Sequence, residues 1–290
     1  MRVHCVCGIL PSARDIATTA QLEEVSMKKL GPMVALAMAL GFGIGAWAQT
    51  ADAQQTQDPR VADLVQAGVL RFGLGLGTPM TAVKNPKTGE LKGPAVEMGR
   101  ALAARIGVKF ETIEYLRPGA VIDGLRSNAW DVSILVYDPE RAEKVDFSNA
   151  YLQSELTYLV APGSSIHSFA EVDQPGIRIA VPRGDGSDLY LTRTLKRAEL
   201  IRTESHSAAV ELLRTGGADV KASPRPVLMV EASTLPGARV LDGGFADLYF
   251  AALVPKGKAD RLSYINDFIE EAKASGLVKR IIESSGLQGV

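Results

Sequence analysis

Residues able to carry metal or covalent chemistry are few in this sequence. Cys5 and Cys7 stand at the N-terminus, and the three histidines, His4, His167 and His206, lie far apart. These spacings fit neither a cysteine-based zinc site nor a disulfide framework in the body of the chain, and we expect His167 and His206 to be solvated loop residues. No GxxxxGK[ST] phosphate loop and no GxSxG nucleophile elbow occurs. The sequence therefore predicts no catalytic residues, no metal site and no cofactor.

One glycine-rich segment could bind a solute through its backbone N–H groups. The run Gly184-Asp185-Gly186-Ser187 precedes a predicted helix that carries Leu189, Leu191 and Leu195. Free N–H groups and the helix dipole at such a position favour an anion; the alternative is a simple turn in which Asp188 caps the helix. A second run, residues 73–77, superficially matches a dinucleotide fingerprint. Its spacing is wrong and Pro79 follows it, so we discount it.

Composition narrows the class of protein. The chain has 290 residues, 32 Lys and Arg against 33 Asp and Glu, a net charge of −1 and a hydrophobic fraction of 46%. A balanced charge argues against a nucleic-acid binder, which needs a clustered basic surface. The apolar content is too high for a disordered chain. The length suits one or two globular domains.

The first fifty residues have the pattern of an export signal. A basic start at residues 27–29 precedes an apolar stretch over residues 30–47, and small-residue sites follow at residues 46–48 and 51–53. The alternative is a membrane anchor, but glycines and Pro32 interrupt the apolar stretch, which is short for a span. We therefore predict a non-structural extension over residues 1–26 and a cleaved signal peptide over residues 27–53. No cysteine follows the apolar stretch, so the predicted periplasmic protein is not a lipoprotein.

Strands and helices alternate in the remaining chain. Apolar runs at residues 69–74, 108–115, 131–137 and 176–181 predict strands, and periodic apolar residues at 94–106 and 208–214 predict helices. Residues 75–92 are expected to form a long loop, and residues 260–285 two helices that break at Gly276. Such alternation predicts parallel sheets covered by helices. Two such runs predict two α/β lobes with a ligand cleft between them.

Several segments, read in order, resemble the bacterial extracellular solute-binding proteins of family 3, the periplasmic receptors of amino-acid-type ABC transporters. The most specific is Asp138-Pro139-Glu140-Arg141-Ala142-Glu143-Lys144-Val145-Asp146-Phe147-Ser148, which resembles the family's "TPERxxxVDFS". Residues 89–97, 177–184 and 253–257 resemble further family segments in the right order. The resemblance implies an α/β, two-lobed periplasmic-binding-protein fold of type II with a two-strand hinge. Lobe one would comprise residues 60–153 plus 257–290, and lobe two residues 154–256.

The resemblance also implies where a solute binds. Arg141 matches the family's arginine that grips the solute carboxylate, and a guanidinium suits that role because it donates two parallel charge-assisted bonds. The alternative for Arg141 is a surface residue paired with Glu140 or Asp146. Thr78 and Met80 lie in the loop that supplies a wall of the family's site, and Tyr137 is expected either to line the cleft or to pack beneath it. The run Gly184-Asp185-Gly186-Ser187 matches the family's lobe-two binding loop.

Two departures from the family pattern concern specificity. Asp185 and Gly186 replace the usual hydroxyl residues, and Asp185 could instead hold a solute ammonium. Pro224 and Arg225 stand near the position of the family's amine-binding aspartate. A cation there would repel an amine and attract a second carboxylate, which favours a dicarboxylate, an acidic amino acid or another organic anion; the alternative is an exposed, uninvolved arginine.

These observations predict a monomeric periplasmic protein, not an enzyme, that captures a small carboxylate-bearing solute, an amino acid or a related organic anion. Its partners would be an inner-membrane ABC permease and a separate ATPase, with no nucleic acid. One alternative is an enzyme of the cyclohexadienyl dehydratase type on the same fold. It would need a general acid with a raised pKa, for which Asp185 or Glu155 are the candidates. Another alternative is a ligand-binding accessory of a membrane sensor.

Overall fold

The structure is a computed structural model that describes residues 58–287. The predicted extension over residues 1–26 and the predicted signal peptide over residues 27–53 lie outside the described residues. No helix within residues 58–287 is both long enough and apolar enough to cross a membrane.

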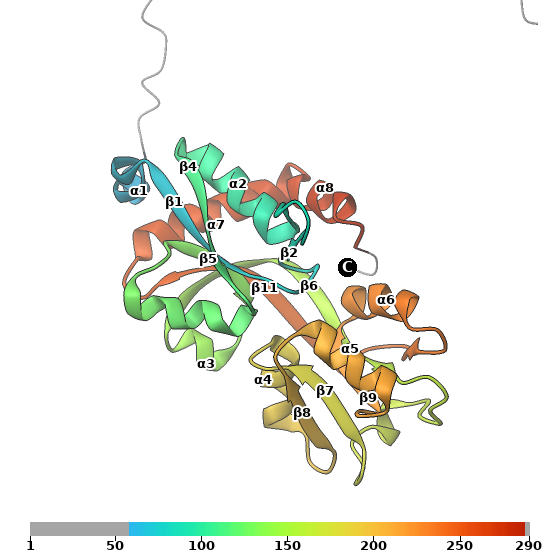
Figure 1. The fold of residues 1–290 in the computed structure, drawn as a ribbon. Coiled ribbons are helices and arrows are strands. Elements are labelled where there is room, and N and C mark those ends of the chain that lie inside the picture. Colours follow the sequence, from blue (N-terminus) through green and yellow to red (C-terminus); the bar gives the residue numbers. More distant parts are fainter. Residues whose placement is uncertain (1–57, 288–290) are drawn as a thin grey trace, which may run out of the picture. The chain divides into compact units, whose positions relative to one another are not determined.

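Two lobes share a single nine-stranded sheet (Figure 1). The strand order is β4-β1-β5-β11-β6-β9-β7-β8, with β10 paired to β6. We call lobe one the part built on β1, β4 and β5, and lobe two the part built on β7, β8 and β9. The strands are β1 (Val69–Gly75), β4 (Lys109–Tyr115), β5 (Val132–Val136), β6 (Val145–Val160), β7 (Arg178–Pro182), β8 (Glu199–Thr203), β9 (Val220–Pro224), β10 (Arg239–Val240) and β11 (Ala246–Pro255).

The strands within each lobe are parallel, as the alternation predicted. In lobe one β1 pairs in parallel with β4 and β5, and in lobe two β7 pairs in parallel with β8 and β9. Between them run β6 and β11, which are antiparallel to each other and to their neighbours. The earlier residues of β6 pair with β11, whereas Leu156 to Val160 pair with β9. These two strands therefore join the lobes, and the division of the chain near residues 154 and 256 stays a prediction.

Helices cover the sheet of each lobe. Lobe one carries η1 (Pro59–Val61), α1 (Ala62–Ala67), α2 (Pro94–Ile106), η2 (Pro118–Ser127), α3 (Pro139–Ala142), α7 (Ala259–Ala274) and α8 (Leu277–Ser284). Lobe two carries η3 (Phe169–Glu171), α4 (Gly186–Thr194), α5 (His206–Thr215) and α6 (Arg225–Thr234). In Figure 1, α2, α7 and α8 gather around the sheet of lobe one, while α5 and α6 lie along lobe two. The predicted fold class is thus confirmed.

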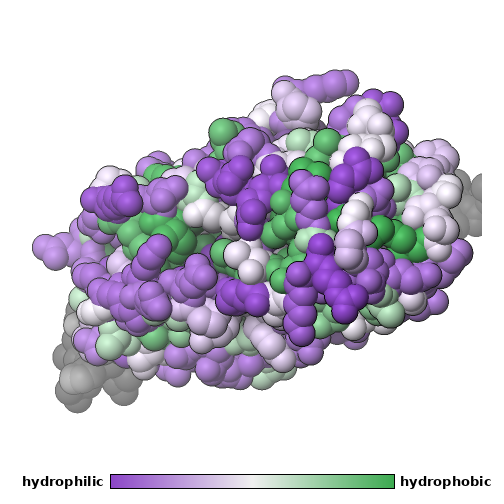
Figure 2. All heavy atoms as spheres, turned by 90° about the horizontal axis from the view of Figure 1, so that it is seen from below, coloured by the Kyte–Doolittle hydropathy of each residue, from purple (hydrophilic) through white to green (hydrophobic). Residues whose placement is uncertain are grey.

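Local sequence explains where the elements begin and end. Pro94 opens α2, where its missing N–H costs nothing, and Gly107 ends the helix in the left-handed region at a φ of 81°. The segment predicted as a loop over residues 75–92 also holds a short antiparallel hairpin of β2 (Val83–Lys84) and β3 (Leu91–Lys92). Each strand has only two residues, which is too short to give a recognisable pattern in the sequence. The face seen from below is mainly hydrophilic, with apolar residues in patches between polar ones (Figure 2).

Candidate functional site

Arg141 lies at the centre of the candidate site. It stands in α3, whose N-cap Asp138 accepts hydrogen bonds from the backbone N–H groups of Glu140 and Arg141. The Arg141 side chain is 5% exposed. Its Nη1 donates to the carbonyl of Val136 at 2.8 Å, and its Nη2 donates to the carbonyl of Gly184, in lobe two, at 2.7 Å. The guanidinium therefore spans the boundary between the lobes.

The charge of Arg141 has no ion-pair partner among the described residues. The nearby carboxylate of Asp138 is engaged elsewhere, because its Oδ2 lies 2.7 Å from Nη1 of Arg193 on α4. Burial lowers the pKa of Arg141, while Asp185 and Asp138 act in the opposite direction. A guanidinium has five N–H donors, and only two of them donate within residues 58–287. The remaining three have no hydrogen-bond partner within this range.

A cavity of about 160 Å³ opens beside this guanidinium. Its lining comes from both lobes, with Arg141 and Gly119 on one side and Gly184 and Leu189 on the other. The α3 and α4 helices approach each other here (Figure 1), joined by the pair Arg193–Asp138. Arg141 thus borders a cavity at the junction of the lobes, where a small solute could be enclosed by both.

Two glycines allow the lobes to come this close. Gly184 has a φ of 70°, which side chains rarely adopt. A Cβ atom on Gly119, in η2, would lie 2.9 Å from the Gly184 carbonyl oxygen. Any larger residue at position 119 would therefore push the lobe-two loop away and break its bond with Arg141.

Asp185 follows Gly184 and is buried, at 7% exposure. Its Oδ1 accepts from the Gly186 N–H at 2.7 Å, which makes it the N-cap of α4. Burial raises the pKa of Asp185, but His206, the Gly186 N–H and Arg141 outweigh it, and the pKa lies below its usual range. The predicted anion site at this helix start is thus capped by an anion of the chain itself. Next to it, the hydroxyl of Ser187 is fully buried without a hydrogen-bond partner in the described residues.

A buried charged cluster lies behind Asp185. We call Asp185, His206, Lys221 and Glu231 the lobe-two quartet. Lys221 is 0% exposed, and its Nζ lies 2.7 and 2.9 Å from the two carboxylate oxygens of Glu231. His206 Nδ1 lies 3.3 Å from Lys221 Nζ, and His206 Nε2 lies 3.3 Å from Asp185 Oδ2. The expectation that His206 is a solvated loop residue is wrong, because α5 turns its ring into the lobe, at 7% exposure.

Thr78, Met80 and Tyr137 do not line the cavity beside Arg141. Met80 is 0% exposed within the lobe-one core, and Thr78, at 5% exposure, accepts a hydrogen bond from the Met80 N–H. Tyr137 is 48% exposed and packs edge-on against Phe147. A solute contact by Thr78, Met80 or Tyr137 stays a prediction.

Arg225 is engaged in lobe two. Its guanidinium donates to Glu155 at 2.9 and 3.0 Å and to the carbonyls of Leu241 and Gly243. These bonds join α6 to β6 and to the chain before β11. The sequence argument for a second solute carboxylate depended on an unpaired cation at Arg225, and the ion pair with Glu155 weakens it.

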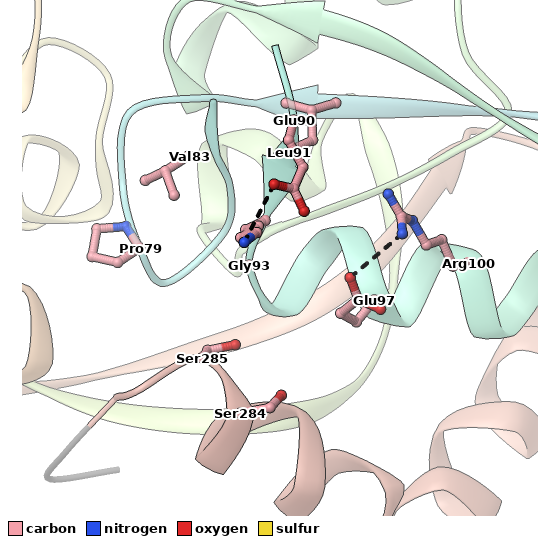
Figure 3. A pocket seen from close by; sticks show the side chains of 10 residues that line it. Pro79, Val83, Glu90, Leu91, Gly93, Glu97, Arg100, Ser284 and Ser285 are labelled. Carbon is pink, nitrogen blue, oxygen red and sulfur yellow. Dashed lines mark ion pairs between the residues drawn. The ribbon is translucent and has the colours of Figure 1, made fainter. Parts of the chain in front are cut away.

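A second cavity, of about 400 Å³, lies within lobe one (Figure 3). Its charged lining is internally paired, with Glu90 Oε2 3.3 Å from Lys92 Nζ and Glu97 Oε1 3.9 Å from Arg100 Nη1. Pro79 borders this cavity, and Ser284 and Ser285 close it from the end of α8 (Figure 3). It contains none of the predicted site residues. Within residues 58–287 no group of three or more His, Cys, Asp or Glu is placed to hold a metal ion.

Three members of the lobe-two quartet, His206, Lys221 and Glu231, were absent from the predicted site. One signal was available: Lys221 stands in a strand whose other residues are apolar, small or proline. A charge in such a strand requires a buried partner. The sequence does not say which residue that partner is, because His206 and Glu231 come from two separate helices.

The fold and the site define a two-lobed binding protein of the type II periplasmic class. Residues 70–286 match the bacterial extracellular solute-binding proteins, family 3, and the chain belongs to this family. The similar curated proteins include the ABC transporter glutamine-binding protein GlnH of Bacillus subtilis, which is 23% identical over 71% of this chain and 76% of its own length. The chain is thus related to amino-acid-binding proteins of ABC transporters.

Enzymes occur among the relatives as well. The cyclohexadienyl dehydratase of Pseudomonas aeruginosa is 23% identical, over 79% of this chain and 87% of its own length. A solved ancestral amino-acid-binding protein, a precursor of cyclohexadienyl dehydratase, superposes with a TM-score of 0.68 at 26% identity. That match covers 77% of this chain and 98% of the ancestral chain.

Proposed function

We propose that this protein captures an amino acid in the periplasm and delivers it to an inner-membrane ABC permease. Arg141 carries the proposal. It is a buried guanidinium with three free N–H donors and no ion pair within the described chain, on a cavity lined by both lobes. A buried cation without a partner is costly. A solute carboxylate would compensate that cost with two charge-assisted bonds.

Asp185 is the residue that we assign to the solute amine. It adjoins Gly184, whose carbonyl accepts from Arg141, so a group bound beside Arg141 lies near it. Among the other acidic groups near the junction, Asp138 pairs with Arg193 and Glu155 pairs with Arg225. Asp123 and Glu140 also line the cavity, and both are exposed, whereas Asp185 is buried. The lowered pKa of Asp185 keeps it ionised at neutral pH, as an ammonium requires. Amino-acid binding by the relatives agrees with this assignment.

The same charges argue against catalysis. A dehydratase needs a group that gives up a proton, and the two candidate acids were Asp185 and Glu155. Asp185 has a lowered pKa, the reverse of what a general acid needs at neutral pH. Glu155 is bound by Arg225 and half-exposed. Neither carboxyl suits proton donation, so we propose that binding, and not reaction, is the activity.

A thermal-shift screen of the chain from Gln54 onward tests the function. The twenty amino acids and the 2-hydroxy acids of the same side chains would be added singly. A solute at about one hundred times its Kd adds about 2.7 kcal/mol to the stability. We expect at least one amino acid to raise the midpoint, and Arg141→Met to abolish that rise. Arg225→Met is the matched control, which keeps the rise.

The outcomes separate the alternatives. A rise that survives in Arg141→Met refutes the proposed carboxylate site. No rise with any compound refutes amino-acid capture. If the protein consumes a cyclohexadienyl substrate over time, as measured by the absorbance of that substrate, the enzyme is favoured instead.

A further inference from the structure

The lobe-two quartet connects the interior of lobe two to the proposed amine site. β9 supplies Lys221, α6 supplies Glu231, α5 supplies His206, and the N-cap of α4 supplies Asp185. The chain of contacts runs from Lys221 through Glu231 and His206 to Asp185. Asp185 is the member of the quartet that follows Gly184, a residue that lines the cavity beside Arg141. His206 lies between Asp185 and the buried pair of Lys221 and Glu231.

The charge of the quartet depends on His206. Asp185 and Glu231 contribute two negative charges, and Lys221 contributes one positive charge. When His206 carries its proton, the four groups sum to zero; without that proton, one negative charge is left uncompensated inside lobe two. A buried net charge is unfavourable unless a counter-charge approaches. An ammonium at Asp185 is such a counter-charge.

The ring is placed to compete for Asp185. His206 Nε2 lies 3.3 Å from Asp185 Oδ2 and is a buried nitrogen with no hydrogen-bonding partner in the described chain. The contact is therefore an ion pair without hydrogen-bond alignment. Its other nitrogen, Nδ1, faces Lys221 at 3.3 Å and Glu231 at 3.7 Å. The ammonium of Lys221 can donate to Nδ1 when the ring is neutral, so both protonation states have a partner.

We propose that His206 sets the solute preference of lobe two. Protonated, it occupies Asp185 and disfavours an ammonium there; deprotonated, it leaves Asp185 to the ammonium of an amino acid. The charged groups that face it are Asp185 from α4, Lys221 from β9 and Glu231 from α6, with Arg141 of lobe one close to Asp185. This inference rests on the proposed function for Arg141 as the carboxylate site.

Two opposing influences act on the pKa of His206. Burial and Lys221 lower it, but Asp185 and Glu231 outweigh them, so the pKa lies above the ordinary value of a histidine. The preference should therefore change at a pH above the ordinary pKa of a histidine, which is about 6.5. Below that range the site should discriminate least between amino acids and their amine-free analogues.

The test compares the two solute classes at two pH values. Affinities of the twenty amino acids and of the matching 2-hydroxy acids are measured at pH 5.5 and pH 8.5. We expect the ratio of amino-acid affinity to hydroxy-acid affinity to be about tenfold higher at pH 8.5 than at pH 5.5. A tenfold change corresponds to a shift of one unit in the pKa of His206 when the ammonium binds. His206→Gln, which cannot be protonated, should show the same ratio at both pH values. His167→Gln, at the other described histidine, should behave as the unmodified chain.

Two results overturn the proposal: a ratio that does not change with pH in the unmodified chain, or one that changes equally in His206→Gln. A second measurement is independent of any solute. The pKa of His206, followed by NMR, should fall in Asp185→Asn, and an unchanged pKa refutes the contact. If no compound of either class binds at either pH, the proposed function fails, and the NMR titration alone decides whether His206 responds to Asp185.

Discussion

Arg141 in lobe one and Lys221 in lobe two are both buried cations, at 5% and 0% exposure, but their surroundings differ. Lys221 lies within 2.9 Å of both oxygens of Glu231. Arg141 has two carbonyl oxygens and no carboxylate in ion-pair contact among the described residues. A buried charge with an ion-pair partner in the same chain has a structural role, because folding itself brings the two groups together. An unpaired one points to a counter-charge from outside the chain.

The same comparison applies to Arg141 and Arg225, which the sequence both suggested as ligands of a solute carboxylate. Arg225 donates to Glu155 and to two carbonyls of its own lobe. Arg141 reaches across to Gly184 and keeps three donors free. Both are cations, but Arg141 is buried and Arg225 is partly exposed. They also differ in how many of the five N–H groups the chain itself uses.

The largest expected effect is on the paired cation. Lys221→Met leaves the Glu231 carboxylate buried beside a neutral side chain, and removing one partner of a buried pair costs about 3–5 kcal/mol. Urea unfolding monitored by circular dichroism measures the loss. Lys87→Met, at an exposed turn lysine, is the control and should change the stability by less than about 0.5 kcal/mol. A loss below about 1 kcal/mol for Lys221→Met would mean that this charge is not a compensated scaffold pair.

A smaller effect is expected from pH. The pKa of His206 is raised in the folded chain, so the stability it contributes is complete below about pH 6.5 and is lost as the pH rises through the folded value. The pKa values of Asp185 and Glu231 are lowered, so their contribution is complete above their unfolded values and is lost as the pH falls. The unfolding free energy should therefore decline on both sides of a maximum between about pH 5 and pH 6.5.

Histidine variants test the decline of the unfolding free energy at alkaline pH. We expect His206→Gln to remove the decline above pH 6.5, worth about 1.4 kcal/mol for each tenfold change in proton affinity, and to keep the decline in acid. His167→Gln should keep both. Urea unfolding at intervals from pH 3 to pH 9 provides the data, and an alkaline decline that persists in His206→Gln contradicts the role given to the ring.

The fold could be predicted further than the site. The spacing of apolar runs and of Gly and Pro is local information. It was enough for the parallel strands of each lobe, for α2 with its end at Gly107, and for the two lobes, but not for the short hairpin of β2 and β3. Arg141 could be predicted because the family pattern that it resembles lies in one contiguous segment, residues 138–148. The lobe-two quartet depends instead on contacts between β9, α5, α6 and the start of α4. No single segment carries that information, and the partner of Arg225 is also remote, at Glu155.

The smallest expected change in stability is also the sharpest test of the comparison. Arg141→Met removes a buried cation and two hydrogen bonds to carbonyls. The lost bonds are each worth about 1 kcal/mol, but the desolvation cost of the guanidinium disappears with it. We therefore expect an unfolding free energy within about 1 kcal/mol of the unmodified chain, in contrast to Lys221→Met. Arg225→Met, which loses an ion pair and two further bonds within one lobe, should cost more while solute binding persists. If Arg141→Met instead destabilises the chain as strongly as Lys221→Met, then Arg141 has a structural role. In that case a solute anion is not needed to explain its burial.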